Sequence, residues 1–343
     1  METEMTDAVC KQENPNKGCA AAGPRRPLII LTGPTAVGKT ALSISLAKAV
    51  DGEIISADSV QVYRHMDIGS AKITGEEMQD VPHHLIDVLD PREDFNVVRF
   101  QKMCKEAMEE IYRRGRVPIL VGGTGFYIQA VLRDIDFTEE EEDSGYRKEL
   151  ADFAAEYGAE ALHNRLCEVD GPSAEAIPPG NVKRVIRALE YYHLTGERIS
   201  EHNERERSRE DAYNACYFVL NDDRDRLYER IEKRVDQMLE EGLVAEVEQL
   251  REMGCRRGQT AMQALGYKEI LKYLEGECSL EEAVYLIKRD TRHFAKRQLT
   301  WFRREKDVIW LDRTKFPEEG QDAAILQYML KIINEKLRLS EDE

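Results

Sequence analysis

One segment of the sequence has the residue types and the spacing of a phosphate-binding loop. It matches the pattern G-x-x-x-x-G-K-[ST], and its residues are Gly33, Pro34, Thr35, Ala36, Val37, Gly38, Lys39 and Thr40. In such a loop, backbone N–H groups converge on phosphate oxygens, and the helix that follows adds a favourable dipole. Lys39 supplies positive charge and Thr40 offers a hydroxyl to Mg²⁺. We therefore predict a pyrophosphate or polyphosphate ligand, with Thr40 as the metal-binding residue.

A second chemical group is the carboxylate of Asp58, which follows a short apolar segment. If that segment is a strand, Asp58 lies at its carboxyl end, where the sites of α/β proteins form. The alternative is that Asp58 caps a helix. P-loop hydrolases usually end a core strand in an acidic residue, but this sequence has Gly122-Gly123-Thr124-Gly125 there, and Asp87 is a weak substitute. The loop alone does not show whether the phosphate is transferred, is hydrolysed or simply leaves.

The elements that must hold these residues alternate between strands and helices. Short apolar runs predict strands at 27–31, 53–56, 84–88 and 117–121, and helical spacing predicts helices at 40–50 and 97–114. This alternation predicts a parallel sheet covered on both faces, with a P-loop NTPase-like core. Later segments predict helices at 224–253, 280–302 and 322–337 and a last strand at 308–311.

A predominantly helical stretch interrupts this core. It follows five acidic residues at 139–143 and has a break at Pro178–Gly180, and strand character returns only at 216–220. We therefore predict an inserted helical domain at 139–213, and an α/β core with C-terminal helices formed by 27–138 and 214–343. Residues 1–26 lack apolar periodicity and carry Pro and Gly, so we predict a disordered leader.

Composition limits the kinds of function. The chain has 343 residues, 42% of them hydrophobic, and a net charge of −17. Its apolar runs are shorter than the roughly 18 residues that span a bilayer, so we expect a cytoplasmic protein. Seven scattered cysteines, without metal-ligand spacing, predict reduced thiols and no zinc. The acidic charge argues against broad attraction to nucleic acid.

The charge is nevertheless unevenly distributed. Residues 288–306 contain eight basic and two acidic residues, a local charge of +6. Within them Lys288, Arg292 and Lys296 recur every four residues, which predicts one basic helix face, either binding nucleic acid or balanced by neighbouring acids. A second, smaller basic cluster in the inserted segment consists of Lys183, Arg184 and Arg187.

Several motifs in one order resemble the tRNA dimethylallyltransferases, also called tRNA isopentenyltransferases. The phosphate loop is one of them, and the resemblance covers roughly residues 27–312. The other segments are Ile55–Tyr63, Met66–Lys72, Gly122–Tyr127, Asn181–Glu190, Thr260–Glu269 and Ala295–Phe302. Eukaryotic members often carry a zinc finger, and this sequence has no Cys/His set for one, so it resembles the bacterial type. We expect a monomer.

The resemblance implies a reaction and roles for particular residues. A dimethylallyl group passes from dimethylallyl diphosphate to N6 of the adenosine 3′ of the anticodon, position 37, and pyrophosphate leaves with the help of Mg²⁺. Asp58 takes the N6 proton, and Thr40 and Arg224 act on the pyrophosphate. We expect the adenosine to be flipped out of the anticodon loop.

The resemblance and the two basic clusters also predict a contact surface for the anticodon stem-loop. Basic residues at two places could hold its phosphates from two sides. The predicted tRNA-contacting residues are Asp58, Ser59, Val60, Gln61, Thr124, Arg147, Lys183, Arg184, Val185, Ile186, Arg187, Gly266, Tyr267, Lys268, Lys288, Arg292 and Lys296.

Three other functions remain open from the sequence. A small-molecule P-loop kinase would use the same loop to transfer a phosphoryl group from ATP. An adenylate isopentenyltransferase would perform the same chemistry on a free nucleotide, and a non-catalytic RNA-binding protein would leave the loop and Asp58 idle. The sequence does not decide whether ATP binds the loop or which tRNAs are substrates.

Overall fold

The structure is a computed structural model that describes residues 25–137 and 144–337. Most of the predicted leader and the acidic run at 139–143 lie outside these residues. Arg26, at the end of the predicted leader, belongs to the ordered core, because its carbonyl accepts a hydrogen bond from the N–H of Asn214 at 2.9 Å and its side chain pairs with Glu109. Among the described helices, none has both the length and the apolar character needed to cross a membrane.

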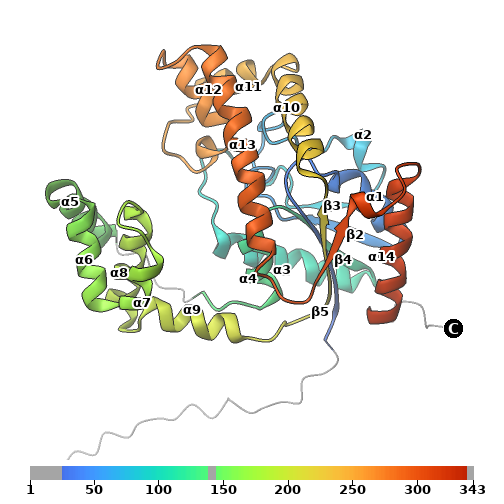
Figure 1. The fold of residues 1–343 in the computed structure, drawn as a ribbon, viewed down its shortest axis with the longest axis horizontal. Coiled ribbons are helices and arrows are strands. Elements are labelled where there is room, and N and C mark those ends of the chain that lie inside the picture. The colour runs from blue at the N-terminus through green and yellow to red at the C-terminus, as the bar shows by residue number, and fades with distance from the viewer. Residues whose placement is uncertain (1–24, 138–143, 338–343) are drawn as a thin grey trace, which may run out of the picture.

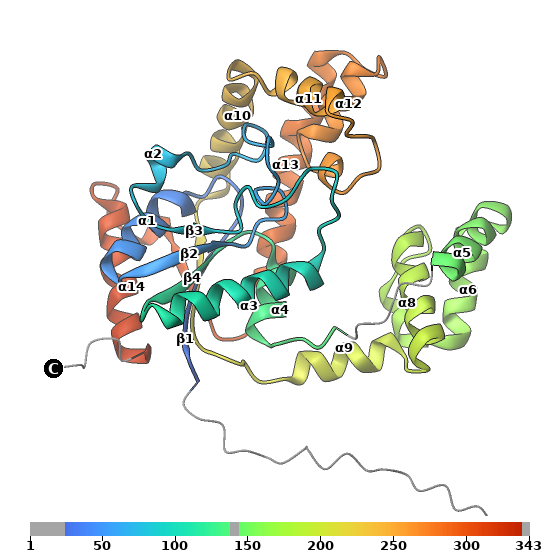
Figure 2. The same ribbon diagram turned by 180° about the vertical axis from the view of Figure 1, so that it is seen from behind.

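A six-stranded parallel sheet forms the centre of the core (Figure 2). Its spatial order is β3-β2-β4-β1-β5-β6, so β1, which leads into the phosphate loop, lies between β4 and β5. This confirms the predicted fold class. The strands are β1 (Pro27–Thr32), β2 (Gly52–Ser56), β3 (His83–His84), β4 (Val117–Gly122), β5 (Asn214–Asn221) and β6 (Val308–Asp312).

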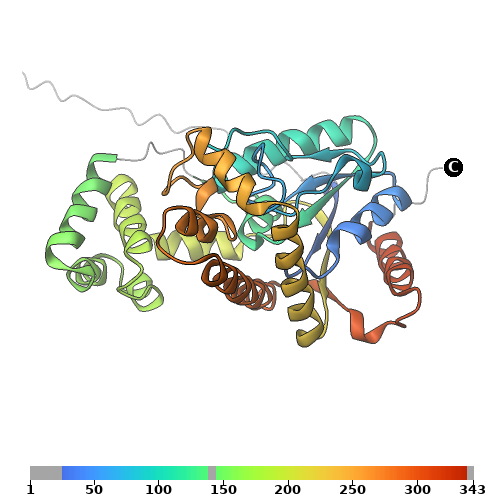
Figure 3. The same cartoon turned by 90° about the horizontal axis from the view of Figure 1, so that it is seen from above.

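Helices cover both faces of the sheet, which is why its central strands are apolar without alternation. One face packs against α1 (Lys39–Ala49) and α14 (Gln321–Leu337), and the other against α3 (Val97–Arg113) and α4 (Gly125–Leu132) (Figure 3). Within β1, Ile29 and Leu31 face the first layer, while Leu28 and Ile30 face the second. The parallel strands therefore end at a common edge, where the loops meet.

The C-terminal helices extend this core beyond that edge of the sheet (Figure 1). They pack with one another and with the loops that follow β2, mostly through apolar side chains of the second layer. The helices are α10 (Arg224–Glu240), α11 (Leu243–Glu252), α12 (Tyr267–Leu274) and α13 (Leu280–Phe302), and a short α2 (Gly75–Met78) precedes β3.

The inserted helices lie to one side of the core and have a hydrophobic cluster of their own, built around Leu150, Leu162 and Leu166 (Figure 1). The break predicted at Pro178–Gly180 falls between two of them. In chain order they are α5 (Ser144–Tyr157), α6 (Ala159–Val169), α7 (Gly171–Ala176), α8 (Val182–Thr195) and α9 (Ile199–Ser208), and α9 leads back to β5.

Two predicted elements differ from the structure. The strand predicted at 84–88 is only two residues long, because Leu85 and Asp87 adopt positive φ angles of 62° and 56°, which end the extended conformation. The single helix predicted at 224–253 is two helices, α10 and α11. Gly242, with a φ angle of 103°, breaks it and lets α11 turn back onto the core.

Candidate active site

The phosphate loop connects β1 to α1, as predicted. Gly33 has a φ angle of 147°, and a Cβ atom there would lie 2.3 Å from the carbonyl oxygen of Leu220, so only glycine fits. Gly38, with a φ angle of 97°, immediately precedes α1 and turns its first N–H groups toward the loop. The loop can therefore receive an anion at a helix N-terminus.

Lys39 folds back over this loop. Its ammonium donates hydrogen bonds to the carbonyls of Gly33, at 3.0 Å, and Pro34, at 2.8 Å. Burial lowers the pKa of Lys39 to about 8, although the carboxylate of Asp58 opposes this shift. The Lys39 ammonium is thus available for a phosphate group and lies within electrostatic reach of Asp58.

The hydroxyl of Thr40 is the oxygen ligand that the loop offers to Mg²⁺. Thr40 is exposed in the first turn of α1, and among the described residues its hydroxyl has no hydrogen-bond partner. Those residues contain no cluster of three His, Cys, Asp or Glu side chains able to hold a metal. This arrangement fits Mg²⁺, which usually binds one or two protein oxygens together with substrate phosphates and water.

Asp58 lies just beyond the carboxyl end of β2. One of its carboxylate oxygens accepts hydrogen bonds from the N–H groups of Val60, at 2.8 Å, and Gln61, at 3.3 Å. No helix begins here, so the alternative role as a helix cap is wrong, although Asp58 does cap a turn. These bonds fix the orientation of the side chain and leave its second oxygen available.

The Gly122-Gly123-Thr124-Gly125 segment follows β4 and lies directly against the Asp58 loop. A Cβ atom at Gly122 would be 2.2 Å from the carbonyl oxygen of Ala57, so glycine is required for this close approach. The N–H of Thr124 donates to the same carbonyl at 3.3 Å. The structure therefore brings Thr124 against the loop that carries Asp58, and its contact with tRNA stays a prediction.

Gln298 of α13 joins the segments after β1 and β4. Its side-chain oxygen accepts a hydrogen bond from the N–H of Thr35 at 3.0 Å, and its side-chain nitrogen donates to the carbonyl of Gly123 at 2.9 Å. The side chain is only 6% exposed. We did not predict this role, because a glutamine in a helix gives no signal of a partner more than 170 residues away in sequence.

An arginine that we did not predict contacts the phosphate loop. Arg224 lies exposed at the start of α10 with its guanidinium over the ring of Tyr228, and its action on pyrophosphate stays a prediction. Arg230 donates to the carbonyl of Ala36 at 3.0 Å. Burial lowers the pKa of Arg234, while the carboxylate of Asp58 opposes this shift, so Arg234 lies within electrostatic reach of Asp58. The spacing of Arg230 and Arg234, one helical turn apart, was the signal we missed.

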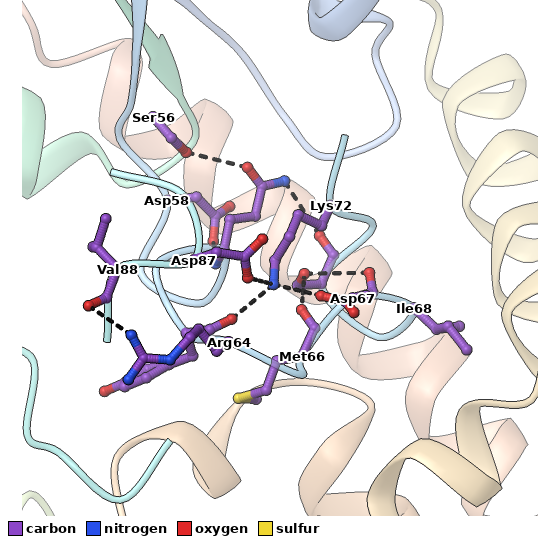
Figure 4. Close-up of polar contacts among 12 residues, drawn as sticks. Ser56, Asp58, Arg64, Met66, Asp67, Ile68, Lys72, Asp87 and Val88 are labelled. Atoms are coloured by element: carbon purple, nitrogen blue, oxygen red, sulfur yellow. Dashed lines mark hydrogen bonds and ion pairs between the residues drawn. The ribbon is translucent and has the colours of Figure 1, made fainter. Parts of the chain in front are cut away.

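A network of hydrogen bonds and ion pairs holds the segment that follows Asp58. The side chain of Gln61 is held by the hydroxyl of Ser56 and by the carbonyls of Ser70 and Ala71, at 3.1 to 3.4 Å. Figure 4 shows Lys72 between Asp67 and Asp87, with 2.5 Å from its nitrogen to each carboxylate. Asp87 is therefore an ion-pair partner rather than a free acidic strand end.

Tyr267 belongs to the same network, which contradicts its predicted contact with RNA. Tyr267 is fully buried, and its hydroxyl donates to the carboxylate of Glu246 at 2.7 Å. Glu246 also accepts hydrogen bonds from the N–H groups of residues 67–69 at 2.7 to 3.0 Å. Gly266 is buried as well, and the ammonium of Lys268 lies 3.5 Å from the carboxylate of Glu269.

In the inserted helices, the predicted basic cluster is exposed on α8, where Lys183, Arg184 and Arg187 face solvent. Val185 is fully buried in the cluster around Leu162, and Ile186 packs against it, so a direct RNA contact by Val185 is contradicted. Because an α-helix turns once in 3.6 residues, Val185 and Ile186 face the hydrophobic cluster while the three basic residues face solvent.

Arg147, also predicted to contact tRNA, lies on α5. Its guanidinium is 2.6 Å from the carboxylate of Glu190, a fully buried residue that also pairs with Arg187 at 3.1 Å. Glu190 therefore joins α5 to the basic face of α8 and holds both arginines near it.

The predicted basic face of α13 is largely neutralised. Lys288 lies 2.5 Å from Asp236 and Arg292 lies 2.5 Å from Glu232, so two of its three cations bind acidic residues of α10. Lys296 is exposed and, among the described residues, forms no ion pair. The interpretation as a balanced face is thus correct for Lys288 and Arg292, whereas Lys296 has no acidic partner in the part of the chain that the structure describes.

Comparisons of this chain with family models and with known proteins all indicate the same family. A family model described as IPP transferase matches residues 61–305, and a second one, isopentenyl transferase, matches residues 27–91. A protein of Lachnoclostridium phytofermentans, named tRNA dimethylallyltransferase, is 63% identical over 91% of this chain and 98% of its own length. One of Carboxydothermus hydrogenoformans with the same name is 52% identical over 84% of this chain and 92% of its own.

Solved structures are similar over the same range. The tRNA isopentenylpyrophosphate transferase of Bacillus halodurans is 46% identical, with a TM-score of 0.69, over 92% of this chain and 99% of that one. A eukaryotic dimethylallyltransferase acting on tRNA is 31% identical, with a TM-score of 0.77, over 91% of this chain and 80% of that one.

Proposed function

Because the chain belongs to the IPP transferase family, which includes the tRNA dimethylallyltransferases, we propose that its phosphate loop binds dimethylallyl diphosphate and that Asp58 accepts a proton from the RNA. The protein is a prenyltransferase that acts on tRNA. The acceptor is N6 of the adenosine 3′ of the anticodon, position 37. Gln298 supports the residue-level part of this proposal, because it hydrogen-bonds both Thr35 of the phosphate loop and Gly123 of the segment that lies against the Asp58 loop. The electrostatic interaction of Asp58 with Lys39 and Arg234 supports it further.

The phosphate loop would stabilise the leaving group. As the bond between the prenyl C1 and the diphosphate oxygen breaks, its electron pair moves onto the departing pyrophosphate. Loop N–H groups and the Lys39 ammonium lie where this negative charge grows, and Arg234 adds a second cation. When bound, Mg²⁺ would be held by Thr40 and would neutralise further charge on the phosphates.

Asp58 would act on the acceptor. The N6 nitrogen forms its new bond to the prenyl C1, becomes positively charged and loses one proton to the free oxygen of Asp58. A carboxylate is a weak base, but the N6 proton becomes strongly acidic as that bond forms, so good placement suffices. The two hydrogen bonds from Val60 and Gln61 provide this placement.

The RNA would be held from both parts of the chain. Thr124 beside Asp58 is positioned to contact the flipped adenosine, and exposed Lys183, Arg184, Arg187 and Lys296 can bind phosphates of the anticodon stem-loop. We also propose that the protein acts as a monomer. Because tRNA is the substrate, we also propose that the protein works in the cytoplasm.

The experiment is mass spectrometry of tRNA nucleosides after incubation of the full chain with tRNA, dimethylallyl diphosphate and Mg²⁺. We expect a prenylated adenosine at position 37 and release of one pyrophosphate. Asp58→Ala should abolish transfer while the affinity for tRNA stays within a few-fold. Asp58→Asn, which keeps the turn hydrogen bonds, is the matched control for folding and should also be inactive.

Other outcomes would point to the rival functions. ADP formed from ATP with a small acceptor would indicate a kinase, and prenylation of free adenine nucleotides in preference to tRNA would indicate an adenylate isopentenyltransferase. Near-normal turnover by Asp58→Asn would refute the role of Asp58 as the base.

A further inference from the structure

The loop between β6 and α14 contacts the phosphate loop, although it follows the residues 61–305 that the family model matches. It begins with a single 3₁₀ turn, η2 (Arg313–Lys315). Because β6 is parallel to β5, which is itself parallel to β1, its carboxyl end reaches the same edge of the sheet as the phosphate loop. No step of the reaction proposed above uses this part of the chain.

Arg313 makes the contact with the phosphate loop. A Cβ atom at Gly38 would lie 2.7 Å from Nη2 of Arg313, so the guanidinium packs directly against that glycine. Gly38 has a φ angle of 97° and immediately precedes Lys39 at the start of α1. Since glycine has the greatest backbone freedom of all residues, a fixed group packed against Gly38 limits the movement of the phosphate loop.

Three hydrogen bonds fix Arg313 to the first turn of α14. Its Nη1 donates to the side-chain oxygen of Gln321 at 2.8 Å, and its Nη2 donates to the carboxylate of Asp322 at 2.6 Å. The side-chain nitrogen of Gln321 donates back to the carbonyl of Arg313 at 2.9 Å. Because α14 itself packs against α1, the guanidinium is held by a rigid part of the core (Figure 2).

The hydrogen bonds of Arg313 do not by themselves explain its position. Its side chain is only 11% exposed, and its Nε is buried without a hydrogen-bond partner among the described residues. A buried unpaired donor costs free energy, so its presence calls for a reason other than the arginine's own hydrogen bonding. The contact with Gly38 supplies such a reason.

We propose that Arg313 is a positioning residue of the phosphate loop, which fixes Gly38 and with it the first N–H groups of α1 for the diphosphate. The inference rests on the proposed function, in which that loop holds the prenyl donor. The effect is preorganisation, because a loop that is already ordered loses less conformational entropy when the anion binds. Arg313 acts through Gly38 and not on the reacting atoms.

One variant separates this role from a simple effect of charge. Asp322 carries a negative charge beside Arg313, so on electrostatic grounds alone its removal would strengthen the binding of an anion at the phosphate loop. If Asp322 instead serves to hold Arg313 against Gly38, Asp322→Ala weakens that binding. Asp322→Asn keeps an oxygen that accepts a hydrogen bond from Nη2, and it therefore preserves the position of Arg313.

The test measures the affinity of the full chain for inorganic pyrophosphate with Mg²⁺ by isothermal titration calorimetry. Arg313→Ala and Asp322→Ala should each weaken binding by about 5- to 20-fold. The double variant should bind about as weakly as Arg313→Ala alone, because the two side chains act as one unit. Asp322→Asn should bind pyrophosphate at least as tightly as the unmodified protein.

Glu318→Ala is the matched control. It breaks an ion pair between the same loop and Arg226, at 2.6 Å, in which both side chains are exposed, and it should leave the affinity for pyrophosphate unchanged. Steady-state kinetics add a second measurement. Arg313→Ala should raise KM for dimethylallyl diphosphate and leave KM for tRNA unchanged, whereas a general loss of stability would not distinguish the two substrates.

The proposal is overturned if Asp322→Ala binds pyrophosphate more tightly than the unmodified protein, or if Arg313→Ala binds it as tightly as Glu318→Ala does. The binding measurement requires neither tRNA nor prenyl transfer. A protein that shows the expected affinities for pyrophosphate but never prenylates tRNA would contradict the proposed function and leave this proposal standing.

Discussion

Gln298 accepts a hydrogen bond from the backbone N–H of Thr35 at 3.0 Å, although the two residues are 263 positions apart in the sequence. The same side chain donates to the carbonyl of Gly123. One end of α13 thus fixes the phosphate loop relative to the segment that lies against Asp58. Gln298 therefore holds the proposed donor site and acceptor site together without taking part in the reaction.

Gln298→Ala should lower kcat/KM for prenyl transfer by about tenfold or more, because the phosphate loop and the Gly123 segment lose their common partner and small misplacements are costly. Thr300→Ala, which removes a hydroxyl bound only to its own helix, is the matched control. Steady-state kinetics with both substrates measure the effect. Equal activity of the two variants would contradict a positioning role for Gln298.

Lys39 should make pyrophosphate binding depend on pH. Its pKa in the free protein is about 8, so its positive charge is present below that pH and is lost as the pH rises above it. The affinity for pyrophosphate should therefore fall between pH 8 and 10, by up to about tenfold per unit. Isothermal titration calorimetry at each pH measures the affinity for pyrophosphate.

The Lys39→Arg variant is the control for this prediction. Its guanidinium stays charged, and the ratio of the two affinities cancels the titration of pyrophosphate itself. A ratio that stays constant from pH 7 to 10 would show that Lys39 does not titrate in this range.

Lys296 and Lys288 should differ in their contribution to tRNA binding. Lys296 is exposed and free of ion pairs among the described residues, whereas Lys288 is held by Asp236 at 2.5 Å. Lys296→Ala should weaken tRNA binding several-fold and lower the slope of log affinity against log salt by about 1. Lys288→Ala should change that slope by less than half as much. Filter binding at several salt concentrations compares them, and equal slopes would contradict the prediction.

Glu53 should stabilise the fold in a pH-dependent manner. Burial alone would raise the pKa of this carboxyl, but hydrogen bonds from Arg114 and His84 outweigh burial and lower the pKa to about 2. Because the folded pKa lies below the ordinary value of 4.5, this stabilisation is complete above about pH 4.5 and is lost as the pH falls toward 2.

Glu53→Gln should reduce the free energy of unfolding at pH 7 by about 3 kcal/mol, with a smaller loss at pH 3. Glu109→Gln, which breaks an exposed ion pair with Arg26, is the comparison and should cost less than about 1 kcal/mol. Urea unfolding at both pH values provides the measurement. If the two variants lose equal stability, or Glu53→Gln keeps the full pH dependence of the native chain, Glu53 lacks this role.

The sequence predicted the features that depend on neighbouring residues. The phosphate loop is eight consecutive residues, and the strands and helices around it follow from local apolar spacing. The order of motifs was also sufficient to predict the family. The two errors in secondary structure were also local in origin, because positive φ angles at Leu85, Asp87 and Gly242 ended elements whose apolar pattern continued.

Tertiary structure decided which side chains meet. Arg230 of α10 donates to the phosphate loop, and acidic residues of α10 neutralise Lys288 and Arg292. Tyr267 and Val185 occur in motifs that suggested RNA contact, yet the fold buries them. The physical reason is that charge pairing and burial depend on contacts between residues far apart in the chain. Local periodicity gives the face of a helix, but only packing determines what lies opposite that face.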